Sequence, residues 1–222
     1  AGCGVMAALT REGGAIRLLM TFSNCSPAPM GGFAIQVNKN PFGLGPASPL
    51  QVPDLAPGTA ADVALPMQAG QLLNSQPPTN PLFLQVAIKS SLDIFYFNVP
   101  FELPVVLLEG AALNRDQFSA IWQSVGETGQ QICTGNCEKP LTDEALRTKL
   151  AADGVNYVAK RSVDDSTTMV YVAATTVTNS VICAELSLRA GNPAIKVVVR
   201  TAMPVLVPLF EATLCKRLGI TR

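Results

Sequence analysis

The sequence IRLLMTF, residues 16–22, indicates the fold of the N-terminal half of the chain. Its apolar side chains alternate with other residues: Ile16, Leu18, Met20 and Phe22. Two further segments alternate in the same way, FAIQV at 33–37 and LFLQVAI at 82–88. Because successive side chains of a strand point to opposite faces, a period of two predicts strands with one buried face. Turn-forming clusters separate these strands, at 11–14, 23–32, 38–49, 55–60 and 69–81, which predicts an antiparallel β-sandwich.

Prolines and charges divide the chain into two parts. Thirteen of the 17 prolines lie in residues 1–104, whereas 23 of the 32 charged side chains lie in residues 105–222. Because proline interrupts helices and is tolerated at turns and strand edges, helices are expected mainly in the second part. We therefore predict two subdomains, a β-sandwich at 1–106 and a second unit at 107–222.

The second unit has the periodicity of helices and strands together. One helical stripe is formed by Phe118, Ile121, Trp122 and Val125, after a start at Asn114 or Asp116. A second helix is expected from its N-cap Thr142 to Gly154, and a third from Pro204 to Gly219. Strands are expected between them, at 155–161, 169–175, 181–189 and 195–200. This order predicts an α+β platform, an antiparallel sheet flanked by helices.

The overall composition excludes several classes of protein. Sixteen basic and 16 acidic side chains cancel, and only 14% of the residues are charged, so the basic surplus of nucleic-acid-binding proteins is missing. No apolar run reaches the roughly 18–20 residues that a membrane-spanning helix needs. The chain begins at Ala1 with no initiator methionine and no signal-peptide pattern, which we interpret as a piece of a longer protein.

The cysteines do not indicate a metal site. There are six, Cys3, Cys25, Cys133, Cys137, Cys183 and Cys215, and no histidine. Cys133 and Cys137 lie four residues apart, but no second pair of ligands has a similar spacing, so zinc is not expected. An even number leaves disulfides as the alternative, yet a chain of this length does not need them. We expect reduced thiols, a cytosolic protein and no metal or cofactor.

Signs of catalysis are few. The sequence has no phosphate-binding glycine loop, serine-hydrolase elbow or paired-histidine motif. Without histidine it also lacks the commonest general base. Glu185, in an apolar strand, is the best candidate for a catalytic carboxylate, and the alternative is a surface residue paired with an arginine. A carboxylate-based hydrolase stays an alternative, but the sequence favours a binding protein that is not an enzyme.

Several short segments share their order and spacing with one known family. They are GFAIQVNKN at 32–40 followed by FG at 42–43, LQVAIK at 84–89, DIFYF at 93–97, FSAIW at 118–122, AKR at 159–161 and AEL at 184–186. Together they resemble the C-terminal appendage, or ear, of the β subunit of heterotetrameric clathrin adaptor complexes. The resemblance covers almost the whole chain and implies an immunoglobulin-like β-sandwich followed by an α+β platform, in agreement with the periodicities.

The resemblance also implies a function in vesicle-mediated transport. Such appendages bind short peptide motifs of clathrin and of accessory or cargo-adaptor proteins, without catalysis or cofactor. They join other adaptor subunits through the rest of the full-length chain and reach the membrane only through the adaptor core. The implied location is the cytoplasm, on clathrin-coated membranes of the plasma membrane or of the Golgi and endosomes. An appendage of another coat, such as a coatomer subunit, is the alternative.

Two peptide-binding sites follow from the resemblance by position. The platform site comprises Trp122, Arg161, Tyr171 and Glu185, with Arg115 nearby. The aromatic residues would receive a peptide Phe, the arginines acidic residues or the carbonyl end of a bound helix, and Glu185 a basic residue of the ligand. A second site, on the side of the sandwich, has Tyr96 with Lys89 as a neighbour.

Two of these site residues have an alternative reading, and one residue outside the sites departs from the family pattern. From the residues alone, Trp122 reads as a core residue of its helical stripe, and Tyr96 can belong to a cross-strand ladder of side chains. Gln130 departs from the family pattern, because animal relatives tend to carry an acid about eight residues beyond the platform tryptophan. This departure can change the charge preference for ligands.

Overall fold

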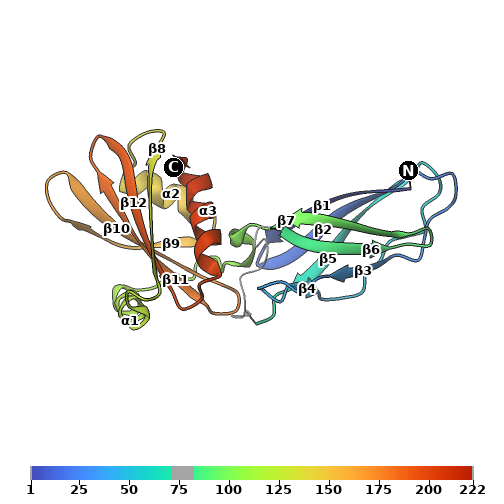
Figure 1. Ribbon diagram of the computed structural model, residues 1–222, viewed down its shortest axis with the longest axis horizontal. Helices are drawn as coiled ribbons and strands as arrows, with labels where there is room; N and C mark the ends of the chain where they lie inside the picture. Colours follow the sequence, from blue (N-terminus) through green and yellow to red (C-terminus); the bar gives the residue numbers. More distant parts are fainter. Residues whose placement is uncertain (1, 72–82, 222) are drawn as a thin grey trace. The chain divides into compact units, whose positions relative to one another are not determined.

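The alternating segments form the sandwich strands of the N-terminal unit, Ala1–Val105 (Figure 1). In the computed structural model, which describes residues 2–71 and 83–221, the strands are β1 (Cys3–Glu12), β2 (Ala15–Asn24), β3 (Ala34–Val37), β4 (Gly45–Pro46), β5 (Ala60–Gln68), β6 (Phe83–Lys89) and β7 (Ile94–Pro100). They make two antiparallel sheets of order β1-β2-β5-β4 and β3-β6-β7. The core includes Leu18, Phe22 and Ile88, so period two identified the buried faces. Leu82 and most of the predicted turn at 69–81 lie outside the described residues.

The second unit, Val106–Arg222, follows the 3-10 turn η1 (Leu103–Val106). Its elements are α1 (Arg115–Val125), β8 (Gln130–Cys137), α2 (Asp143–Ala151), β9 (Val155–Ser162), β10 (Thr167–Thr175), β11 (Val181–Arg189), β12 (Asn192–Thr201), α3 (Leu206–Leu218) and β13 (Ile220–Thr221). The strands form one antiparallel sheet of order β13-β8-β12-β11-β10-β9. The predicted fold class, a sandwich followed by an α+β platform with flanking helices, is confirmed.

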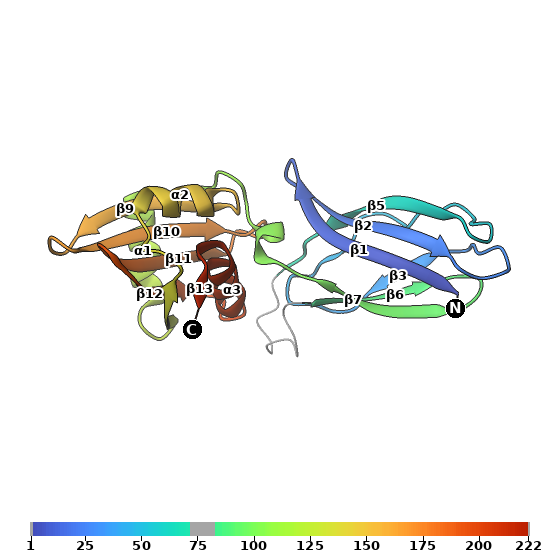
Figure 2. The ribbon, with the colours of Figure 1, turned by 90° about the horizontal axis from the view of Figure 1, so that it is seen from above.

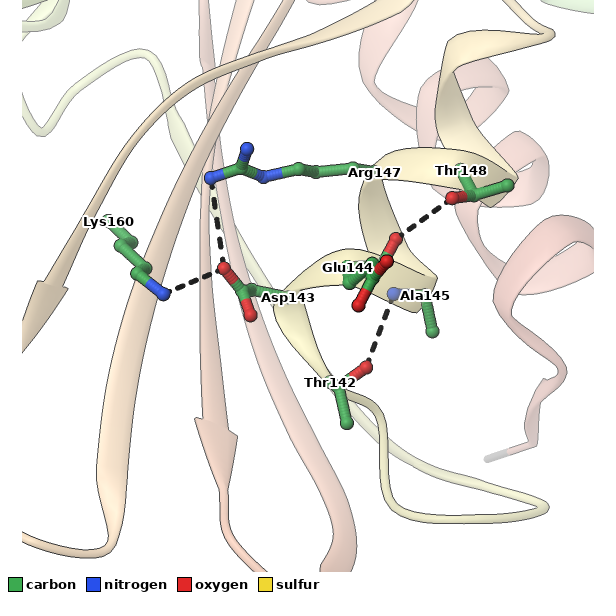
Figure 3. A network of polar contacts seen from close by, with 7 residues as sticks. All are labelled: Thr142, Asp143, Glu144, Ala145, Arg147, Thr148 and Lys160. Carbon is green, nitrogen blue, oxygen red and sulfur yellow. Dashed lines mark hydrogen bonds and ion pairs between the residues drawn. The ribbon is translucent and has the colours of Figure 1, made fainter.

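Local side-chain contacts fix where the helices begin. Asn114 caps α1 through a capping box with Gln117, and the Thr142 hydroxyl accepts a hydrogen bond from the Ala145 amide at the start of α2. Asp143 binds Lys160 of β9 at 2.9 Å, and Arg147 lies 3.7 Å from the same carboxylate oxygen (Figure 3). A carboxylate in the first turn of a helix also interacts favourably with the helix dipole.

Two helix ends differ from the prediction. Helix α2 ends at Ala151, and Gly154 closes the turn that follows it, with a φ of 74° and its amide bonded to the Ala151 carbonyl. Helix α3 begins at Leu206 rather than Pro204, because Val205 takes the N-cap position. Its end agrees with the sequence, since Gly219 has the left-handed conformation that glycine tolerates.

Helices cover both faces of the platform sheet, and the strand register shows which helix lies on which face. Lys160, which binds α2 through Asp143, pairs with Val170, whereas Ala173, which packs against α1, lies three residues further along β10. Because side chains alternate along a strand, α1 and α2 lie on opposite faces. Helix α3 joins the α2 side, where Arg217 donates two hydrogen bonds to buried Asp153. Figures 1 and 2 show α1 apart from α2 and α3. We call the side that carries α1 the α1 face.

Candidate functional site

Helix α1 packs on the sheet through an aromatic cluster. Phe118 is buried against Ala173 and Cys183. The ring of Trp122, one turn further along α1, stacks on Phe118 with centroids 5.4 Å apart and planes 18° apart. Tyr171 of β10 meets the edge of Phe118 at 5.6 Å. The stripe read from the sequence is therefore real, with Phe118 as its buried member.

A hollow of about 300 Å³ opens beside this cluster. Its walls include Arg115, Phe118 and Trp122 from α1, Val158 from β9, Tyr171 from β10 and Glu185 from β11. Trp122 and Tyr171 are only partly buried and line the hollow. Trp122 is thus half-buried: its ring packs on Phe118 in the core cluster, and the residue also lines the hollow.

Strand register brings Tyr171 and Glu185 together. They are direct partners in the β10–β11 ladder, so their side chains lie on the same face about 5 Å apart at Cβ. Burial raises the pKa of the Tyr171 phenol, and its hydrogen bond to the Glu185 carboxylate raises that pKa further. The Arg161 guanidinium acts in the opposite direction on the same phenol. Arg161 is absent from the walls of the hollow but borders it through this contact with Tyr171.

Arg200 is a site residue that the sequence did not indicate. Its guanidinium carbon lies 4.3 Å from the centre of the Trp122 ring, and its Nη1 donates a 2.9 Å hydrogen bond to the Trp122 carbonyl. Nε and Nη2 donate to Gln130 Oε1 at 3.1 and 2.8 Å. Arg200 thus fixes α1 and the indole to the end of β12. The strand itself was predicted, but the contact depends on a register that the sequence does not reveal.

Gln130 is the partner of this arginine. Its neutral amide satisfies two donors of Arg200 without cancelling the charge of the guanidinium. An acid in the same place would form an ion pair there. The surroundings of the Trp122 ring, over which Arg200 lies, are therefore one charge more positive than they would be with a carboxylate at position 130.

The second candidate site lies on the β3-β6-β7 sheet of the sandwich. Tyr96 is 78% exposed and faces Ala87 on the neighbouring strand. Its cross-strand neighbour is thus a small side chain, so both the ladder position and the site are compatible with its exposure. Lys89 faces Ile94, which places it diagonally from Tyr96 on the same side of the sheet. Ile94 and Phe83 are also exposed, so this face presents apolar and aromatic surface to solvent.

Other chemistry is sparse in the part of the chain that the structure describes. No group of three or more Cys, Asp or Glu side chains is arranged there to hold a metal ion. Cys3, Cys25, Cys137, Cys183 and Cys215 are free thiols, and burial raises the pKa of Cys183 to about 12. Of the described residues lining the hollow, Glu185 is the one carboxylate. None of the described helices has the length and apolarity to cross a membrane.

Comparison with known proteins gives the family. Residues 108–218 match the family model of the beta2-adaptin appendage, C-terminal sub-domain, and residues 3–98 match that of the adaptin C-terminal domain. The chain is 34% identical over 206 residues to AP-1 complex subunit beta-1 of Mus musculus, covering 91% of this chain and 21% of that protein.

Two further relatives extend the comparison. Identity is 34% over 195 residues with the Homo sapiens protein of the same name, with 86% and 20% of the two chains covered. The chain is 25% identical over 214 residues to AP-1 complex subunit beta of Dictyostelium discoideum, covering 95% of this chain and 22% of that protein. The chain thus spans about a fifth of the length of these relatives. Two family models cover most of its length in the expected order, so the resemblance read from the sequence is confirmed: the chain belongs to the β-adaptin appendage family.

Proposed function

We propose that this chain is a non-catalytic interaction module of a clathrin adaptor β subunit, and that its platform binds short, Phe-containing helical peptides of clathrin and of accessory or cargo-adaptor proteins. The observation that carries the proposal is the hollow between α1 and the sheet, with Trp122 and Tyr171 partly exposed in its walls. Exposed aromatic side chains that are held rigid typically supply most of the binding energy in such interfaces.

The size of the hollow fits a peptide side chain rather than a whole ligand. At about 300 Å³ it is at the lower limit for small-molecule pockets, which suits the insertion of one aromatic residue. The rest of the peptide would lie outside, on the α1 face. Trp122 needs little reordering on binding, because Phe118 and Arg200 already hold its ring. The entropy cost of binding is correspondingly small.

Charges around the hollow would orient the peptide. Arg115 at the start of α1 can hold an acidic residue or the carbonyl end of a bound helix. Glu185 can accept a basic residue of the ligand, although its carboxylate is shared with the Tyr171 hydroxyl. Because Gln130 leaves the Arg200 charge uncancelled, we expect peptides with fewer basic residues to bind better here than to an appendage with an acid at this position.

The hydrolase alternative receives no support from the lining of the hollow. Carboxylate-based hydrolysis generally needs a pair of acids on either side of the bond that is cleaved. Glu185 stands beside a phenol and a guanidinium instead. The coatomer-type alternative is disfavoured because the relatives are adaptor β subunits.

Binding by one appendage is expected to be weak. A short peptide buries little surface and loses conformational entropy when it becomes ordered, which leaves affinities in the micromolar range. Many adaptors in one coat would supply avidity. We place the protein in the cytoplasm on clathrin-coated membranes, attached through an adaptor core formed with other subunits. The face around Tyr96 and Lys89 would be a second, independent peptide site.

Isothermal titration calorimetry tests the proposal. A 15-residue helical peptide with two Phe residues at helical spacing is titrated into the wild-type chain and into Trp122→Ala and Tyr96→Ala variants. Because loss of a central Trp typically costs 2 kcal/mol or more, Trp122→Ala should weaken binding at least about 30-fold. Tyr96→Ala should not change it. Unchanged binding by a folded Trp122→Ala protein would refute the platform site.

A further inference from the structure

Strand β9 has one residue more than its pairing with β10 needs. Ala159 pairs with Tyr171. The next pair joins Tyr157 to Val172, so Val158 has no residue opposite it in the ladder. An extra residue of this kind is a β-bulge, and it shifts the alternation of side chains in the strand that carries it. The bulge lies at the aromatic hollow, because Val158 and Ala159 both line it.

The residues on either side of the bulge contact helix α2. The guanidinium carbon of Arg147 lies 3.3 Å from the centre of the Tyr157 ring, and Lys160 forms an ion pair with the first turn of α2. In a regular strand, residues three positions apart lie on opposite faces. The bulge brings Tyr157 and Lys160 to the same face, and this leaves Val158 and Ala159 together on the α1 face.

Val158 belongs both to the wall of the hollow and to the core contacts of α1. It is partly buried and packs against the cluster of Phe118, Ala173 and Cys183. A valine side chain has few rotamers, and close packing restricts it further. It therefore cannot easily move aside for a ligand group that is too large.

The neighbouring Ala159 makes Val158 the projecting group of this strand. A single methyl group is the whole side chain of Ala159, which lies opposite Tyr171. Of the two β9 residues in the wall, Val158 is thus the one whose size limits the hollow. Because one methylene group in an apolar pocket changes affinity about 10- to 200-fold, this position can discriminate between ligand side chains. Neither residue is among the site residues that the family resemblance implies.

We propose that Val158 is a specificity-determining residue of the platform, which limits the inserted side chain of the peptide to a single aromatic ring. The inference rests on the proposed function for the position of that side chain. A phenyl ring would pack between Trp122 and Tyr171 with its edge on Val158. The larger indole of a tryptophan would need the space that the two methyl groups of Val158 occupy.

Isothermal titration calorimetry with two kinds of peptide tests this role. One is the helical peptide with two Phe residues, and the others carry tryptophan in place of one Phe or the other. The wild-type protein should bind the Phe peptide at least about tenfold more tightly than one of the Trp peptides. In Val158→Ala the Phe peptide should bind more weakly and this Trp peptide more tightly, so that the ratio of their dissociation constants falls at least about tenfold.

Two further variants test the same position. Val158→Ile adds one carbon to the wall and should weaken the Phe peptide about tenfold. Deletion of Val158 removes the bulge but leaves the pairs on either side of it in register. The deletion variant should therefore fold, and it should lose the preference for Phe over Trp. The thermal unfolding transition of each variant shows that it is folded.

The matched control is Val170→Ala, which removes the same two methyl groups from the opposite face of the sheet. Val170 is buried next to Tyr171 in β10 and lies opposite Lys160. Its replacement should lower the thermal unfolding midpoint but leave the ratio of the two dissociation constants unchanged. An equal fall of the ratio in this variant would attribute the effect to lost stability and overturn the role given to Val158.

The inference and the proposed function fail in different ways. Suppose that Trp122→Ala weakens binding, but that the ratio is the same in wild type, Val158→Ala and the deletion variant. The role of Val158 is then refuted and the proposed function stands, as it also is if the wild-type protein binds the Phe and Trp peptides equally well. If the folded wild-type protein binds none of the peptides, the proposed function itself is refuted.

Discussion

The contacts of Arg200 predict that this residue controls the stability of α1. Replacing Arg200 by methionine keeps an unbranched apolar stem but removes the guanidinium. The variant loses the 2.9 Å bond to the Trp122 carbonyl, the bonds of 2.8 and 3.1 Å to Gln130, and the cation 4.3 Å from the indole. Helix α1 then keeps its packing through Phe118 but not its link to β12.

The size of the effect follows from these contacts. Arg200 and Trp122 are both partly exposed, so each hydrogen bond contributes about 0.5–1 kcal/mol and the cation–π contact about 0.5–1 kcal/mol. The bonds to Gln130 join β12 to β8 and are not counted, because they persist when α1 opens. The bond to the Trp122 carbonyl and the cation–π contact together contribute about 1–2 kcal/mol, which corresponds to roughly a tenfold increase in the population of molecules with α1 detached.

Native-state hydrogen exchange measures this population directly. Amides of α1 from Phe118 to Val125 should exchange about tenfold faster in Arg200→Met, whereas amides of α2 should not change, because local opening is confined to the element that loses its contacts. Arg189→Met, on the same sheet face but away from α1, is the control and should leave α1 unaffected. An equal rate in wild type and Arg200→Met would refute the role given to Arg200.

Three further predictions concern other parts of the molecule. Asp143→Asn should lower the stability of the platform by less than about 1 kcal/mol at neutral pH. Because the bond to Lys160 holds the Asp143 pKa below 3.8, this stabilisation is present above that value and should vanish as the pH falls through the folded pKa, in urea titrations of both proteins. In thiol labelling, Cys25 should react in the native state. Cys183, whose pKa is about 12, should react only after unfolding. Tyr96→Ala should leave the thermal unfolding midpoint within about one degree, because 78% of this side chain is exposed.

Much of the fold was readable from local patterns. Period two located β2, β3 and β6, and side-chain chemistry located the starts of α1 and α2. Four strands of seven or more residues were not predicted, β1, β5, β7 and β8, and β1 and β8 show two different reasons. In β1, Cys3–Glu12, small residues and partial burial on both faces leave no alternation. In β8, the apolar residue Ile132 is exposed while its neighbour Cys133 is buried. The pattern of hydrophobicity along this strand therefore does not mark its buried face.

The candidate site depends on contacts between residues that are distant in the sequence, which local patterns do not reveal. Helical spacing predicted that Phe118 and Trp122 share a face, but not which of the two is buried. Tyr171 was named only through the family resemblance, and Glu185 stood out from the residues only as a carboxylate in an apolar strand. That the two meet depends on the β10–β11 register. A bulge between Tyr171 and Val172 sets the pairing with β9. Arg200 was out of reach because nothing local in the sequence indicates a contact between residues 78 positions apart.

The central claim is that the hollow beside Trp122 receives a peptide side chain. Trp122 is the one tryptophan of the chain, so a ¹H–¹⁵N correlation spectrum contains a single indole Nε1–H signal. Titration with the Phe-containing peptide should shift this signal progressively, together with the amides of Tyr171 and Glu185, and the shifts should saturate at micromolar to submillimolar peptide. An indole signal that stays in place while the peptide demonstrably binds would contradict the account.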